Sequence, residues 1–151
     1  MMELQTTRLT LIPCTETIIS TYQYAAGPHI QMHIEELRKD SSLLGWGPWL
    51  IQNKEDGAVI GDLGFKGKPN SAGEVEIGYG LTPSYQNKGF ATEAVREIIR
   101  WAFEHNEVEK VTAECLVDNL PSIRVLEKLK MTHVHQKDGM LQWMITKEGI
   151  A

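Results

Sequence analysis

The sequence is poor in cysteine, has no excess of positive charge and contains no long apolar run, and each lack excludes a class of function. Its two cysteines, Cys14 and Cys115, match no metal-ligand or redox spacing and sit among apolar residues, which indicates buried free thiols in a reducing compartment. The formal net charge of -5 argues against general nucleic-acid binding, which needs a basic footprint. The first eight residues lack the apolar core of a signal peptide, and no run is long enough to cross a membrane. We therefore expect a cytoplasmic protein that binds neither nucleic acid nor a membrane.

Motifs that would assign a nucleotide or a metal are also missing. The chain has no Walker lysine followed by serine or threonine, and no three-glycine dinucleotide pattern. His29 and His33 are four positions apart, but no third ligand is evident near them. His133 and His135 share one face of a predicted strand, which does not make a metal site. We expect ordinary helix-face and surface histidines and no metal.

What the chain does contain is sufficient for one domain, expected to span residues 1–151. The composition is 42% hydrophobic and 23% charged, and no repeat, linker or low-complexity tract interrupts it. Alternating apolar residues predict strands, and apolar residues at helical spacing predict helices. The expected strands cover residues 8–13, 49–52, 58–66, 74–81, 110–117, 132–136 and 141–146. The expected helices run from a Thr15 or Thr17 cap to about residue 26, and over residues 29–39, 93–105 and 121–130.

The connections between these elements predict the topology. Short turns join the three strands between residues 49 and 81, so these strands should be antiparallel. The helix at 93–105 connects the strand 74–81 to the strand 110–117, and such a right-handed crossover makes those two strands parallel. The predicted fold is of the α/β class in its mixed α+β form. It has a central, mostly antiparallel sheet with one parallel pair, flanked by about four helices.

The segment between the strand 74–81 and the helix 93–105 predicts a ligand site. A helix start presents backbone N–H groups without partners and the positive end of the helix dipole, which suits a phosphate. Gly89 and Ala91 have little or no side chain, so a bulky anion can approach the backbone. We expect a phosphate-bearing ligand at residues 86–92. The alternative is a plain strand-to-helix turn in which Gly89 serves backbone freedom alone.

Two motifs of the chain, about thirty residues apart, resemble those of a known family. Residues 86–91, Gln-Asn-Lys-Gly-Phe-Ala, resemble the Gln/Arg-x-x-Gly-x-Gly/Ala signature of the GCN5-related N-acetyltransferases (GNAT). Residues 119–129 resemble the Asn-x-x-Ser-x-x-Val-Leu-Glu-Lys-Leu helix of the branch that acetylates the N-termini of ribosomal proteins. Residues 7–13 are similar to the first strand of that branch. The resemblance spans nearly the whole chain in the expected order.

The resemblance implies a GNAT fold with a splayed parallel strand pair, acetyl-CoA as donor, no metal, and an amine acceptor on a small molecule or a protein N-terminus. The CoA pyrophosphate would lie on the N–H groups of residues 87–92, and the pantetheine arm would pair with the end of the strand 74–81. The protein would act as a monomer or a homodimer. The residues expected to contact the cofactor are Gly80, Leu81, Thr82, Gln86, Asn87, Lys88, Gly89, Phe90, Ala91, Thr92, Asn119 and Ser122.

Amine acetylation also needs a proton acceptor and a proton donor. Glu76 lies on the strand that would carry the cofactor and is our expected base, ahead of Glu74 on the same face; the alternative is a solvated or salt-bridged glutamate. Many members of the family protonate the thiolate with a helix tyrosine, but that position is Leu126 here. Ser122 is the expected substitute, although a small residue chosen for close packing would look the same. Asn119 would hydrogen-bond the pantetheine or fix the loop, and the alternative is a turn residue before a helix, a position that asparagine favours.

The missing tyrosine keeps a second function open, a non-catalytic module that binds acyl-CoA. The acceptor would be chosen by residues 15–49 and by the turn at 137–140. Four aromatic residues of the first segment could line an apolar cleft, although core packing is the commoner role: Tyr22, Tyr24, Trp46 and Trp49. Ribosomal N-termini, amino acids, polyamines and aminoglycosides all stay open as acceptors. One departure from the family is Lys130, where glycine usually ends the helix.

Overall fold

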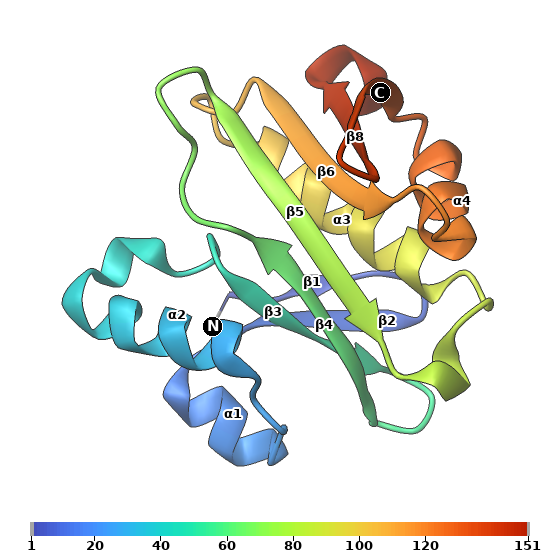
Figure 1. Cartoon of the computed structure of the whole chain (residues 1–151). Helices are drawn as coiled ribbons and strands as arrows, with labels where there is room; N and C mark the ends of the chain where they lie inside the picture. The colour runs from blue at the N-terminus through green and yellow to red at the C-terminus, as the bar shows by residue number, and fades with distance from the viewer. Residues whose placement is uncertain (1, 151) are drawn as a thin grey trace.

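The computed structural model describes residues 2–150, and the strands of this part of the chain form one eight-stranded sheet (Figure 1). The strand order is β1-β2-β3-β4-β5-β6-β8-β7, and every neighbouring pair is antiparallel except β5 and β6. The strands are β1 (Leu4–Gln5), β2 (Leu9–Pro13), β3 (Pro48–Asn53), β4 (Val59–Phe65), β5 (Glu74–Leu81), β6 (Lys110–Leu116), β7 (Thr132–Lys137) and β8 (Met140–Thr146). The helices are α1 (Glu16–Tyr22), α2 (Pro28–Lys39), α3 (Phe90–Phe103) and α4 (Leu120–Lys128), with short 3-10 turns η1 (Ser41–Leu43), η2 (Pro83–Tyr85) and η3 (Lys147–Ile150). The predicted mixed sheet with one parallel pair is confirmed.

Alternate residues of the central strands face two apolar clusters, one on each side of the sheet. On one side α3 buries the predicted stripe that includes Ile98 and Ile99, and Figure 1 shows this helix crossing behind β5 and β6. On the other side Leu50 of β3 packs with Ile30 of α2 and with Cys14. Both cysteines are buried free thiols, as predicted, and burial, reinforced by the charge of Asp62, raises the pKa of Cys14 to about 12. In the described part of the chain, no helix has the length and apolar character needed to span a bilayer.

Several element boundaries differ from the prediction for local reasons. The helix α3 begins at Phe90 instead of residue 93, because Gly89 takes a left-handed conformation with φ +81° and serves as its N-cap. The helix α1 ends at Tyr22 instead of near residue 26, because Gln23 turns left-handed at φ +50°. The strand β1 was not predicted, since two residues are too few to show an alternating pattern. Thr15 caps α1, as one of the two expected alternatives.

The parallel strands β5 and β6 separate before either of them ends. Their pairing covers Glu74 to Ile77 on β5 and Lys110 to Ala113 on β6, whereas β5 continues to Leu81. On its other edge β5 stays paired to β4 as far as Leu81. The strand pair therefore opens into a gap beside Tyr79, which agrees with the splayed pair that the resemblance implied.

Two residues after the end of α4, Lys130 has a backbone conformation that favours glycine. Lys130 has φ +63°, and its N–H and that of Met131 bond to the carbonyls of Glu127 and Leu126, which closes the helix end. A β-carbon in this conformation costs about 1 kcal/mol. The variant Lys130→Gly should therefore raise the free energy of unfolding by about 0.5–1 kcal/mol in a urea titration.

The matched control for this prediction is a glycine placed where the helix does not need one. Arg96 is exposed in the interior of α3, and Arg96→Gly should lower the free energy of unfolding by about 1 kcal/mol. A loss of stability in Lys130→Gly of similar size would contradict the prediction.

Candidate active site

The turn that leads into α3 presents a row of free backbone N–H groups. Gly89 and Asn87 both take positive φ angles, +81° and +61°. The first N–H to close a helical bond is that of Glu93, which donates to the Gly89 carbonyl at 3.1 Å. For the N–H groups of residues 87–92, the described part of the chain supplies no acceptor. These groups and the positive end of the α3 dipole make a surface suited to phosphate.

Arg8, just before β2, holds this turn in place. Its Nη1 donates to the Lys88 carbonyl at 3.0 Å, its Nε donates to Glu93 at 2.7 Å, and its guanidinium lies 4.2 Å from the centre of the Phe90 ring. Glu93 also accepts hydrogen bonds from the Thr6 hydroxyl at 2.6 Å and the Arg8 N–H at 2.9 Å. Burial opposes the charge of Glu93, but the hydrogen bonds from Thr6 and Arg8 outweigh it and keep the pKa of its carboxyl below the usual value. The turn that leads into α3 is thus braced by an ion pair.

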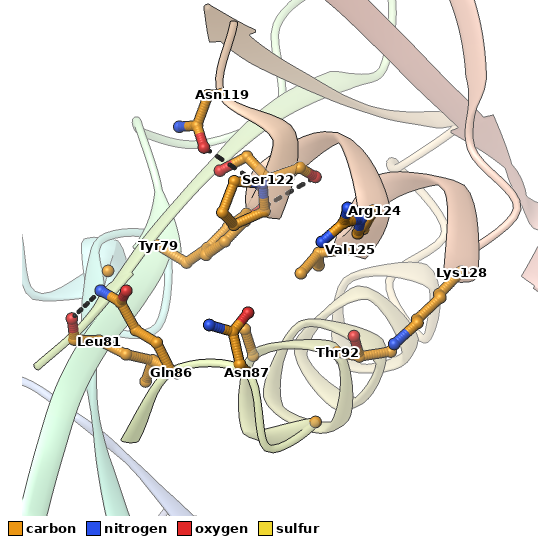
Figure 2. Close-up of a pocket in the computed structure, with 14 residues that line it drawn as sticks. Tyr79, Leu81, Gln86, Asn87, Thr92, Asn119, Ser122, Arg124, Val125 and Lys128 are labelled. Carbon is orange, nitrogen blue, oxygen red and sulfur yellow. Dashed lines mark hydrogen bonds between the residues drawn. The ribbon is translucent and has the colours of Figure 1, made fainter. Parts of the chain in front are cut away.

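A cavity of about 410 Å³ lies between this turn, the end of β5 and α4 (Figure 2). Most of the residues predicted to contact the cofactor line it: Gly80, Leu81, Gln86, Asn87, Gly89, Ala91, Thr92, Asn119 and Ser122. Three predicted residues do not. Thr82 donates its N–H to the Ile60 carbonyl, Lys88 gives its carbonyl to Arg8, and Phe90 is buried.

The cavity wall on α4 includes cations that the sequence analysis missed. Arg124 and Lys128 both line the cavity, together with Pro121 and Val125. Figure 2 shows the Lys128 side chain extending toward Thr92 at the start of α3. The spacing of four residues between Arg124 and Lys128 puts them on one helix face, and this signal was present in the sequence. The direction in which that face points depends on how α4 packs.

At its inner end the cavity meets unpaired backbone of β5. The N–H of Lys66 donates to the Glu76 carbonyl, and that of Thr82 donates to the Ile60 carbonyl, so the even-numbered residues of β5 bond to β4. Because backbone direction alternates along a strand, the N–H and C=O groups of Tyr79 and Leu81 point to the gap where β6 is absent. The Leu81 carbonyl accepts a hydrogen bond from the Gln86 side chain at 3.0 Å.

The start of α4 brings Ser122 to this inner end. The Asn119 side chain accepts the N–H of Ser122 at 3.2 Å and so caps the helix. The hydroxyl of Tyr79 donates to the Ser122 carbonyl at 3.4 Å, and burial raises the pKa of that tyrosine. Leu126, which holds the position of the family tyrosine, is 1% exposed and belongs to the core.

The two glutamates expected near the cofactor form ion pairs instead of lining this cavity. Glu76 is bonded to the Lys66 ammonium at 2.6 Å, and Glu74 lies 3.4 Å from Lys110. Hydrogen bonds from Asn70 and Lys110 and the charge of Lys110 hold the pKa of Glu74 below its usual value. Glu76 is four residues from Gly80, which is about 13 Å along a strand. The salt-bridged alternative for Glu76 is therefore what the structure shows.

A second cavity, of about 620 Å³, lies over β4 and β5 on the side covered by α2. Tyr79 and Gly80 line both cavities, so the two cavities meet at the end of β5. Of the four aromatic residues expected at an acceptor site, Trp46 lines this cavity, while Trp49 is fully buried in the core. Asp62 and His29 line it as well, and neither was singled out from the sequence as part of a site for the acceptor. Among residues 2–150, no cluster of three or more His, Cys, Asp or Glu side chains has an arrangement that could hold a metal.

Comparison with known proteins extends the resemblance in the motifs to the chain as a whole. A family described as an acetyltransferase (GNAT) domain matches residues 8–132. The uncharacterized N-acetyltransferase YjdG of Bacillus subtilis is 35% identical over 114 residues, which cover 75% of this chain and 68% of YjdG. The uncharacterized N-acetyltransferase p20 of Bacillus licheniformis is 37% identical over 89 residues, 59% of this chain, and this match covers 48% of p20.

The fold is shared with solved structures of acetyltransferases. The structure of RimL, a ribosomal L7/L12 alpha-N-protein acetyltransferase in complex with coenzyme A, superposes with a TM-score of 0.77 at 16% identity, and the match covers 98% of this chain and 99% of that one. At this identity the likeness shows a shared fold. The family match at residues 8–132 carries the assignment. It includes β2, α4 and the turn before α3. The chain therefore belongs to the GNAT acetyltransferases and is an acetyltransferase of that family.

Proposed function

We propose that this chain transfers an acetyl group from acetyl-CoA directly to a primary amine. The observation that carries the proposal is the continuity of the first cavity, which runs from the free N–H groups of residues 87–92 to the gap beside Tyr79. Acetyl-CoA has a diphosphate, two amides and a thioester in that order. Diphosphates suit helix starts, and amides pair with unpaired strand backbone. The coenzyme A bound to RimL, which has the same fold, supports this assignment.

Charge and backbone geometry assign roles along the cavity. The diphosphate would accept hydrogen bonds from the turn that includes Gly89, and Arg124 and Lys128 would contribute positive charge from the α4 wall. The pantetheine amides would pair with the backbone of Tyr79 and Leu81. The thioester would then lie in the gap, within reach of Ser122.

The reaction forms a C–N bond and breaks a C–S bond. The amine nitrogen attacks the thioester carbonyl carbon and loses one proton, and the C–S electron pair leaves on sulfur, which is protonated to the thiol. The Tyr79 N–H, which faces the gap, would donate to the developing oxyanion. The Ser122 hydroxyl would donate the proton to sulfur. Glu76, the base expected from the sequence, remains a candidate but has its carboxylate engaged by Lys66.

The test is release of free thiol from acetyl-CoA in the presence of a panel of primary amines, together with equilibrium binding of acetyl-CoA. We expect binding in the micromolar range and thiol release that depends on the amine. Tight binding without thiol release across a broad panel would replace the transferase with the acyl-CoA-binding module. Displacement of bound CoA by ATP or NAD at similar concentrations would instead indicate a general nucleotide site.

Loss of the brace on the phosphate turn should weaken donor binding. Arg8→Ala removes the hydrogen bond to Lys88 and the ion pair with Glu93, so the turn no longer holds its N–H groups in register. We expect the dissociation constant of acetyl-CoA to rise about tenfold, corresponding to about 1.4 kcal/mol. Arg100→Ala, which removes an exposed arginine paired with Glu97 farther along α3, should leave the constant unchanged. Equal effects in the two variants would refute the bracing role.

A further inference from the structure

Asp62 of β4 occupies the point where the second cavity meets the end of β5. It lies directly across from Gly80 in the β4–β5 ladder, so the two residues project to the same face of the sheet. A β-carbon built on Gly80 would meet no atom within 4 Å, which leaves open space beside the Asp62 carboxylate. Gly80 also lines the first cavity. A group held by Asp62 is therefore next to the strand end at which the thioester is proposed to lie.

The carboxylate of Asp62 is held by two side chains from the helical layer. The Tyr24 hydroxyl donates to its Oδ2 at 2.7 Å, and His29 Nε2 lies 3.0 Å from its Oδ1. Burial and the bond to Asp62 raise the pKa of Tyr24, so the phenol stays protonated as a donor. Cys14 is the other titratable group near Asp62, and its raised pKa keeps it neutral. The Asp62 side chain is 21% exposed, so it retains access to solvent and to a ligand.

The cavity next to Asp62 combines apolar walls with negative charge. Met32, Leu43 and Trp46 line it, and Met32 is exposed at 60%, as a flexible thioether at the mouth of a binding cavity would be. Glu36 adds a second carboxylate, and burial lowers the pKa of His33, which is therefore neutral near pH 7. The Lys66 ammonium at the rim is already paired with Glu76. The lining thus favours a cation that carries apolar surface.

We propose that Asp62 binds the acceptor's amino group and takes its proton, and that the second cavity selects a primary amine with an apolar substituent. This inference rests on the proposed acetyl transfer and names the acceptor side of it. The bound ammonium first gives one proton to the Asp62 carboxylate, which releases it to water. The neutral nitrogen then bonds to the thioester carbon, and its second proton passes to Asp62 and from there to water. Tyr24 and His29 are positioning residues that fix the carboxylate. The apolar substituent packs against Met32, Leu43 and Trp46.

Two carboxylates on the same face of the sheet give a matched pair of variants. Asp62→Asn should lower kcat/KM for the amine about 100-fold while the dissociation constant of acetyl-CoA stays within about twofold. Glu76→Gln tests the competing base expected from the sequence; because its carboxylate is already paired with Lys66, we expect it to have the smaller defect in kcat/KM of the two variants. A parent-like Asp62→Asn enzyme, or a Glu76→Gln enzyme with the larger defect across pH 6 to 9, would overturn the assignment.

A second variant covers the case in which Asp62→Asn does not fold. Gly78→Val places a side chain in the second cavity, where a β-carbon on Gly78 would meet only Lys66 Cε, at 4.0 Å, and Gly78 is not part of the first cavity's lining. It should raise KM for the amine at least about tenfold with donor binding nearly unchanged, because the obstruction lies on the acceptor side. For the positioning residues, Tyr24→Phe should lower kcat with little change in KM, and equal turnover to the parent would remove Tyr24 from this role.

The substituent is tested with a series of n-alkylamines from ethylamine to hexylamine, with phenethylamine, with spermidine, and with peptides that begin in leucine or in aspartate. KM should fall by about fourfold per methylene while the chain stays within the cavity. Spermidine and the aspartate peptide should be poor acceptors. Alkylamines and leucine peptides both present a primary amine next to an apolar group. Their relative kcat/KM shows whether the acceptor is a small molecule or a protein N-terminus. A flat alkyl series would refute apolar selection.

A binding measurement separates failure of this inference from failure of acetyl transfer. Hexylamine is titrated calorimetrically into the parent and into Asp62→Asn, each saturated with CoA. Asp62-dependent amine binding without any turnover would leave the acceptor site standing and refute the proposed reaction. Turnover that does not depend on Asp62 would support acetyl transfer and refute the acceptor site. Absence of both amine binding and turnover would refute the acceptor site and the reaction.

Discussion

Replacing Gly89 with glutamate is expected to abolish acetyl-CoA binding, with a rise of at least about 100-fold in the dissociation constant, or about 2.7 kcal/mol. Two effects combine. The φ of +81° disfavours any side chain by about 1–2 kcal/mol, so the turn would distort. The added carboxylate would also lie among the N–H groups proposed to bind the diphosphate, where like charges repel. Isothermal titration with acetyl-CoA measures the result.

Two controls separate strain from charge in this experiment. Gly139→Glu places the same carboxylate at the same kind of backbone position, φ +78°, in the turn between β7 and β8, and it should bind acetyl-CoA like the parent. Gly89→Ala retains the strain without the charge, and its dissociation constant should rise by about tenfold or less. Unchanged affinity in a folded Gly89→Glu protein would refute the placement of the diphosphate.

Removing the Ser122 hydroxyl is expected to lower kcat about 100-fold, within the range that general acid catalysis contributes. Ser122 lines the first cavity next to Tyr79, and Leu126, at the position of the family tyrosine, is buried and has no proton to give. The variant Ser122→Ala should keep its affinity for acetyl-CoA within about twofold, because Asn119 caps the helix through the Ser122 backbone N–H. Steady-state thiol release and calorimetry measure the two quantities.

The result for Ser122 has a direct control and a clear counter-result. Ser84 lies exposed in η2, outside the cavity lining, and Ser84→Ala should retain full activity. Ser122→Thr keeps a hydroxyl and should recover part of kcat. A Ser122→Ala enzyme as fast as the parent at every pH would refute Ser122 as the proton donor to sulfur. Tyr79, whose hydroxyl reaches the same part of α4, would then be the next proton donor to test.

Several residues predicted for the site lie close together in the sequence and also line one cavity, and their contact with a cofactor stays a prediction. Gly89, Asn87 and Thr92 line the first cavity because a turn and a helix start arrange their own backbone, whatever packs around them. The same holds for Asn119, whose capping role follows from residues three positions away. Lys88 and Phe90 belong to the same turn, but one gives its carbonyl to Arg8 and the other is buried.

The prediction was weakest where an ionisable group takes its partner from another strand. Glu76 stood on the expected strand and face, yet its carboxylate is paired with Lys66, ten positions away on the neighbouring chain segment. The alternating pattern of β5 predicts which face of the sheet Glu76 is on. It does not predict that the Lys66 side chain, from the neighbouring strand segment, lies close enough to pair with it. Asp62 could not be identified in the sequence for the same reason, because its partners lie 38 and 33 positions away.

The sequence alone was sufficient to predict the strand alternation, the apolar stripe of α3 and the free N–H groups of residues 87–92. Each of these depends on neighbours within a few residues. Tertiary packing decided the features that join distant segments. These are the ion pair of Arg8 with Glu93, the cluster around Asp62, and the gap at which both cavities meet. Such features depend on which side chains the sheet register and the helix docking bring within a few ångströms, and no short window of sequence contains that information.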